Sequence, residues 1–171
     1  MPDRDPIREA RRQWLEHGWD EAADGMAMVT SIARVHQLLM ERIEAVLRPL
    51  RLSFARYEVL RLLAFTRAGA LPMTRLGSLL QVHPTSVTSA VDKLEEQGFC
   101  RRSRGSADKR IVLAEITDEG RMVVEKATEG LNEVFATPGL SRADVGALTG
   151  LLDLLRAAAG DLVERAAEAT D

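Results

Sequence analysis

The chain has 171 residues, of which 46% are hydrophobic, 29% charged and 4% aromatic, with one cysteine and a net charge of −3. This length suits one domain with extended arms, and the apolar share excludes a disordered chain. A single cysteine excludes an internal disulfide framework. Since the sequence has neither an apolar leader nor a membrane-spanning apolar run, we expect a cytoplasmic protein with no membrane partner.

The first 50 residues predict two helices. Asp5 and Pro6 suit the start of the first helix, and Gly18 suits its end. A second, long helix is expected from about Asp24 to Pro49. Its apolar positions alternate in steps of three and four, a stripe suited to a partner helix, made of Val29, Ile32, His36, Leu39, Ile43, Val46 and Leu50.

Residues 51–80 predict two more helices, separated by at most a very short strand at 71–73. Ser53 is a suitable N-cap for the first, which should end near Gly69, and Thr74 caps the second. Helical spacing predicts that the apolar residues face a core: Val59, Leu60 and Leu63, then Leu76, Leu79 and Leu80.

A tight turn at 82–83 leads to the next helix, which is expected to begin at Pro84 and end at Gly98. Val87, Val91 and Leu94 recur at i, i+4 and i+7 and predict a buried stripe. Two β-rich runs, 99–104 and 111–116, flank a glycine-containing loop, which is typical of a hairpin. Cys100, in the first run, is expected to be a small core or edge residue.

Two helices complete the chain, one capped by Thr117 and running to about Phe135, the other beginning after Ser141. In the last helix we expect Leu148, Leu151, Leu152 and Leu155 to face inward, in a stripe that continues to Leu162. The fold class is therefore mainly α with a small β-hairpin wing (α+β). A winged helix-turn-helix over 51–117 is flanked by an N-terminal arm and dimerisation helix (1–50) and C-terminal helices (118–171) that complete the dimer interface.

The middle of the chain is basic although the whole is acidic: residues 51–116 hold 11 basic and 6 acidic side chains. A polyanion-binding face gives this pattern, and so does ordinary solvated helix surface. In a winged helix-turn-helix the second helix enters the major groove of DNA. The residues expected to contact double-stranded DNA are Arg75, Thr85, Ser86, Thr88, Ser89, Lys93, Arg104, Asp108, Lys109 and Arg110, with Asp108 orienting the Arg110 guanidinium.

The segment LGSLLQVHPTSVTSAVDKLEEQGFCRRSRGSADKRIVLAEITDEG resembles the DNA-binding segment of the MarR (multiple antibiotic resistance regulator) family. The shared features are the helix VTxxVDxLExxG, the Asp-x-Arg at Asp108 and Arg110, and the closing Ile116–Gly120. The resemblance spans about residues 26–165. It implies a homodimer that binds a pseudo-palindromic operator, usually as a repressor, and that a small molecule often releases from DNA.

Two features depart from compact members of that family. Ser89 stands where many relatives have a longer polar or basic residue, and the arm over 1–25 is longer. Relatives that sense urate or similar acids have extended arms and an acid at the position of Glu58. The resemblance therefore points to a small anionic aromatic effector, with Trp19, His36, Arg56 and Glu58 as candidate ligands. Trp19 as a packing anchor and His36 as an interface residue remain alternatives, and the cysteine of the peroxide-sensing branch is absent.

Catalysis is not expected. His17, His36 and His83 have no Cys, His or acid at metal-ligand spacing, and the sequence has neither a phosphate-binding glycine loop nor a nucleophile elbow. No metal or cofactor is therefore predicted. The alternative function is a winged helix that contacts another protein without operator specificity, which would favour an acidic or apolar wing over this arginine-rich one.

Overall fold

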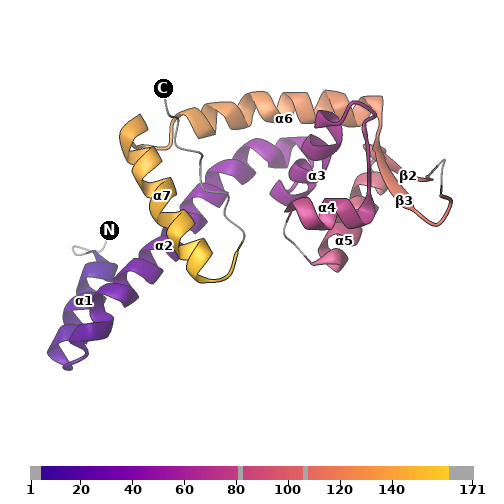
Figure 1. Cartoon of the computed structure of the whole chain (residues 1–171). Coiled ribbons are helices and arrows are strands. Elements are labelled where there is room, and N and C mark those ends of the chain that lie inside the picture. Colours follow the sequence, from indigo (N-terminus) through magenta and orange to yellow (C-terminus); the bar gives the residue numbers. More distant parts are fainter. Residues whose placement is uncertain (1–4, 81–82, 106–107, 162–171) are drawn as a thin grey trace, which may run out of the picture. The chain divides into compact units, whose positions relative to one another are not determined.

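The computed structural model describes residues 5–80, 83–105 and 108–161, which fall into two compact units divided between Val134 and Phe135 (Figure 1). The predicted turn residue Val82, the hairpin-tip residues Ser106 and Ala107, and Leu162 lie outside the described residues. The elements in chain order are α1 (Pro6–Glu16), α2 (Asp20–Leu47), the 3₁₀ helix η1 (Arg48–Leu50), α3 (Phe54–Phe65), β1 (Ala70–Pro72), α4 (Met73–Leu80), α5 (Pro84–Glu96), β2 (Cys100–Arg104), β3 (Val112–Ile116), α6 (Asp118–Ala136) and α7 (Arg142–Ala158).

The expected fold class, a mainly helical winged helix-turn-helix, is confirmed. Strands β2 and β3 pair antiparallel from Cys100 opposite Ile116 to Arg104 opposite Val112. The very short strand predicted at 71–73 corresponds to β1, which pairs with the other edge of β3 and gives the sheet order β1-β3-β2. The described helices are too short or too polar to cross a membrane.

Local sequence signals fix both ends of α5. At its start, His83 Nδ1 accepts a hydrogen bond from the backbone N–H of Thr85 at 3.3 Å. At its end, the N–H of Gly98 donates to the carbonyl of Glu95 and the N–H of Phe99 to that of Leu94. These two bonds form a Schellman motif, which requires the left-handed backbone that Gly98 adopts at φ +77°. The helix therefore ends at Glu96, and β2 begins four residues later at Cys100.

The core of the first unit lies between α3, α4, α5, the sheet and α6. The predicted stripe of α5 is confirmed, because Val87, Val91 and Leu94 are buried. The inward prediction for Leu79 is wrong, since this side chain is 50% exposed on the short helix α4. The other predicted positions pack in the core or against it: Val59, Leu60, Leu63, Leu76 and Leu80.

The apolar stripe of α2 divides into two parts. Ile43 is buried in the core, with Val46 and Leu50 packed against it, and a methyl carbon of Val46 lies 2.7 Å from the position that a Cβ on Gly130 of α6 would take. The N-terminal part, which includes Val29, Ile32 and Leu39, is exposed in the single chain. Only the N-terminal part of α2 is therefore left for a partner helix.

The inward prediction for the last helix is also wrong for the single chain. In the second unit α7 leaves Leu148, Leu151, Leu152 and Leu155 exposed, with Leu151 at 61%. The helical spacing places these leucines along one side of α7, but no described element of its own unit covers them. Helix α7 therefore has an exposed apolar side.

Close packing explains why the last position of the Ile116–Gly120 motif is a glycine. Replacement of Gly120 by alanine is expected to destabilise the fold by about 1–3 kcal/mol. A Cβ on Gly120 would lie 2.0 Å from the carbonyl oxygen of Phe99, a backbone atom that cannot rotate away. Urea unfolding of Gly120→Ala checks this. The control is Gly25→Ala in α2, where a Cβ would have nothing within 4 Å, and equal midpoints for the two variants would contradict the expectation.

Candidate nucleic-acid interface

The polar residues predicted for DNA contact occupy the exposed side of α5. Thr85, Ser86, Thr88 and Ser89 are exposed opposite the buried stripe, and Lys93 follows one turn further along the helix. The short hydroxyl side chains allow the helix backbone to approach a base edge or a phosphate closely. Lys93 Nζ is already paired with Glu96 at 2.7 Å, so its charge is partly compensated.

A shallow groove of about 590 Å³ connects this face to the start of α3. Ser53, Ala55 and Arg56 form one wall, and the other comes from α5: Thr85, Ser86, Ser89, Ala90 and Lys93. Ser53 itself is the N-cap of α3, where its Oγ accepts from the N–H of Arg56. Arg75, the remaining predicted contact of this region, is exposed on α4 and does not line the groove.

Arg104, Lys109 and Arg110 are exposed on the β2–β3 hairpin, the wing. A β-turn over residues 108–111 follows the hairpin tip, with the N–H of Ile111 donating to the carbonyl of Asp108 at 3.1 Å. The predicted role of Asp108 needs correction. Its carboxylate accepts the backbone N–H of Arg110 at 2.9 Å in an Asx-turn, because an aspartate side chain readily bonds the backbone N–H two residues further along the chain.

The other two wing arginines are neutralised by carboxylates of the fold. Arg101 pairs with Glu115 on β3 at 2.9 Å, and Arg102 pairs with Asp92 at 2.5 Å and Glu95 at 2.6 Å on α5. The N–H and guanidinium of Arg102 lower the pKa of Glu95, and the Ser103 hydroxyl and Arg101 lower that of Glu115. Carboxylates of β3 and α5 therefore compensate two of the wing arginines, and Arg102 joins the wing to α5.

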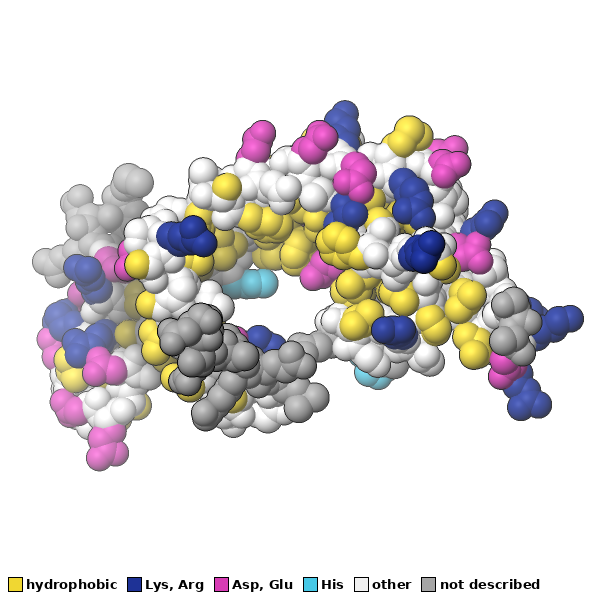
Figure 2. Space-filling view, turned by 45° about the horizontal axis from the view of Figure 1, so that its top comes forward, with side chains coloured by type: hydrophobic (Ala, Val, Ile, Leu, Met, Phe, Trp, Pro, Cys, Tyr) yellow, Lys and Arg dark blue, Asp and Glu magenta, His cyan; other side chains and the backbone are white. Residues whose placement is uncertain are grey.

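Charge remains concentrated at the tip of the wing. Figure 2 shows Lys and Arg side chains projecting where the hairpin lies, while hydrophobic side chains gather elsewhere on this face. In the described part of the chain, Arg104, Lys109 and Arg110 make no ion pair. These three side chains are therefore available to pair with an anion of another molecule.

The structure does not bring the four candidate effector residues together. Trp19 is 53% exposed between α1 and α2, where it packs edge-on against Trp14 with ring centroids 5.3 Å apart. His36 is exposed on α2. Arg56 lines the groove beside α5, and Glu58 is half-buried on α3, where burial raises its pKa. Within the described residues of one chain, Trp19 and Arg56 line separate hollows.

Several residues of a second hollow are not predicted by the sequence patterns. Arg48, Arg51 and Gln97 line it together with Arg56 and Lys93. Gln97 bonds to residues 41 and 46 positions earlier in the chain, a relation that helical spacing does not encode. The cluster of arginines just before and after Ser53, in LRPLRLSFAR, is the one local signal of this hollow.

Cys100 lies in the core, as expected, at the first position of β2. Burial raises the pKa of its thiol to about 11. Because the thiolate is the reactive form, this cysteine is a packing residue rather than a reactive one.

A helix with an exposed polar side, beside a cationic wing, is typical of a winged-helix DNA-binding protein. The sequence model of the MarR family matches residues 52–112. Sco5413, a MarR family transcriptional regulator from Streptomyces coelicolor, is 43% identical, with a TM-score of 0.72 over 82% of this chain and 99% of that one. The chain belongs to the MarR family of transcriptional regulators.

Two further solved structures share the fold. Sco3205, a MarR family regulator from Streptomyces coelicolor solved in complex with DNA, is 24% identical, with a TM-score of 0.69 over 75% of this chain and 86% of that one. BpsR from Bordetella bronchiseptica, whose DNA binding is regulated by 6-hydroxynicotinic acid, is 22% identical, with a TM-score of 0.67 over 74% of this chain and 90% of that one.

Proposed function

We propose that the protein is a homodimeric repressor that binds a pseudo-palindromic operator and responds to a small ligand. The observation that carries the DNA-binding part is the exposed hydroxyl face of α5 together with wing cations that make no ion pair within the described residues. The hydroxyls suit contacts in the major groove, and arginine suits the strong negative potential of a narrow minor groove. Sco3205, of the same fold, was solved with DNA, which supports this assignment.

Selection of bound duplexes from random DNA tests the proposed operator binding. We expect a two-fold symmetric site whose half-sites lie about 10 bp apart, one helical turn, because a symmetric dimer presents two copies of α5. Recovery of no common sequence, together with affinity that does not fall as salt is raised, would contradict operator binding. That outcome would favour the alternative, a winged helix that contacts another protein.

Dimerisation is supported by apolar surface that one chain leaves uncovered. Val29, Ile32 and Leu39 on α2 are exposed, as are the leucines of α7. Contiguous exposed apolar surface is typical of protein interfaces. Residues 1–50 and 118–171 therefore carry the dimer interface in this proposal, and residues 51–117 carry the DNA contacts.

The effector is proposed to be a small anionic aromatic molecule that weakens DNA binding, because ligand and DNA favour different separations of the two α5 helices. Arg56 supplies a cation beside α5, and BpsR is regulated by an aromatic acid. Since the four candidate residues are apart within one chain, the site would need the second chain. We expect urate, salicylate or a phenolic acid to raise the melting temperature and release the operator; no shift with any of them would contradict this class.

A further inference from the structure

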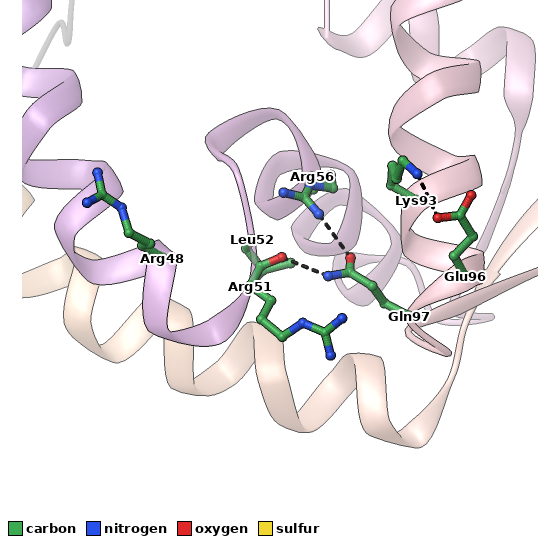
Figure 3. A pocket seen from close by; sticks show the side chains of 7 residues that line it. All are labelled: Arg48, Arg51, Leu52, Arg56, Lys93, Glu96 and Gln97. Atoms are coloured by element: carbon green, nitrogen blue, oxygen red, sulfur yellow. Dashed lines mark hydrogen bonds and ion pairs between the residues drawn. The ribbon is translucent and has the colours of Figure 1, made fainter.

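Arginine side chains line a hollow of about 510 Å³ between the end of α2, the start of α3 and the end of α5 (Figure 3). It is lined by four cationic side chains, one acid and two neutral residues: Arg48, Arg51, Arg56 and Lys93; Glu96; Leu52 and Gln97. Lys93 already engages Glu96 at 2.7 Å. Arg48 pairs with Glu44, which does not line the hollow, at 3.9 Å. The other two arginines line the hollow without an ion pair to a carboxylate of the described residues.

Neutral partners orient the guanidinium of Arg56 and bind the main chain of Arg51. Gln97 Nε2 donates to the carbonyl oxygen of Arg51 at 2.8 Å, and Gln97 Oε1 accepts from Arg56 Nη1 at 3.1 Å (Figure 3). Arg56 Nε donates to Ser53 Oγ at 3.1 Å. Because amide and hydroxyl oxygens orient a guanidinium without cancelling its charge, the hollow is arranged for an anion from outside.

The backbone of Arg51 supports the same conclusion. In the described part of the chain it is the one non-glycine residue with a positive φ, at 58°. Arginine disfavours this left-handed conformation. The turn nevertheless directs the Arg51 carbonyl to Gln97, and the Arg51 guanidinium has no hydrogen bond or ion pair within the described residues. Glycine or asparagine would adopt this backbone at a lower cost in free energy. The arginine therefore contributes its cationic side chain to the hollow rather than stability to the turn.

We propose that this hollow binds a phosphate of the DNA backbone, outside the bases that α5 contacts, an inference that rests on the proposed operator binding. The hollow shares Arg56 and Lys93 with the groove beside Thr85 and Ser89. With 13 residues, α5 is about 20 Å long, whereas the major groove is about 12 Å wide. When the first half of α5 lies in the major groove of DNA, its second half therefore lies beside the phosphates that flank the contacted bases.

The test uses the full chain and the selected operator, with one phosphate at a time replaced by a neutral methylphosphonate. Arg51→Asn removes the guanidinium and keeps a residue type that tolerates the left-handed backbone. Arg67→Asn is the matched control, because Arg67 is exposed and does not line the hollow. Circular dichroism and sedimentation establish that both variants keep the fold and the oligomeric state.

For the wild type and Arg67→Asn, we expect a methylphosphonate at one flanking position per half-site to weaken binding at least fivefold. Arg51→Asn should bind the unmodified duplex at least fivefold more weakly and should be insensitive to the methylphosphonate at that position. Its salt slope should be smaller by about 0.9 for each phosphate that the protein no longer neutralises. Arg56→Gln should behave in the same way.

The outcomes separate the two proposals. A wild-type protein that binds no duplex contradicts the proposed function itself. A wild-type protein that binds the operator, while Arg51→Asn and Arg56→Gln keep the wild-type response at every modified phosphate, overturns the phosphate site and leaves operator binding intact.

Discussion

Arg110→Ala is expected to weaken operator binding by about 1–3 kcal/mol and to reduce the preference for A·T-rich flanks. The Asx-turn fixes the backbone of Arg110 through Asp108, while its guanidinium has no ion pair in the described structure. The side chain is therefore available for a minor groove, whose negative potential is strongest in A·T-rich DNA. Anisotropy titration at about 150 mM salt, where exposed charges are well screened, measures the effect.

Arg101→Ala is the matched control on the same wing. The Arg101 side chain is 73% exposed, but it is paired with Glu115 at 2.9 Å. Its removal should change operator affinity by less than about 0.5 kcal/mol, as for most surface substitutions. Equal affinities for Arg110→Ala and the wild type would show that the wing is a basic surface loop without a role in operator binding.

Ile32→Glu is expected to convert the proposed dimer to a monomer at micromolar concentration and to lower operator affinity about 100-fold or more. Ile32 is 40% exposed in the single chain, so a carboxylate there is solvated in the monomer and the fold is kept. In the dimer the same carboxylate would be buried without a partner. A monomer binds one half-site only, and the avidity of two linked α5 helices is then absent.

Sedimentation velocity and anisotropy titration measure both effects. Gln37→Glu is the control, because it adds the same charge at an exposed polar position of α2. This variant should stay dimeric and bind the operator as the wild type does. A dimeric Ile32→Glu protein would place the interface away from this part of α2.

The elements that local patterns specify could be predicted from the sequence. Pro84, the stripe of Val87, Val91 and Leu94, and Gly98 give the start, the buried face and the end of α5 in one short segment. The wing follows from two β-rich runs around a glycine-containing loop, and its pairing agrees with that pattern. These signals are local, so a single sequence contains them in full.

Partners and pairings were harder to predict. Helical spacing groups Leu148 and Leu151 on one side of α7, but it does not say whether that side meets the same chain or another. The pairing of Arg102 with Asp92 and Glu95 depends on how the wing folds against α5. At Asp108, a spacing of two residues fits both a guanidinium contact and an Asx-turn, and the structure has the Asx-turn.

Dimethyl sulfate footprinting of the selected operator is the most direct test of whether two copies of α5 contact bases in successive major grooves. Dimethyl sulfate methylates guanine N7, which faces the major groove. Docking of both helices predicts two patches of N7 protection about 10 bp apart on one face of the duplex, both absent for Ile32→Glu at the same protein concentration. Bound operator with no protected guanine N7 in either half-site would contradict this mode of binding.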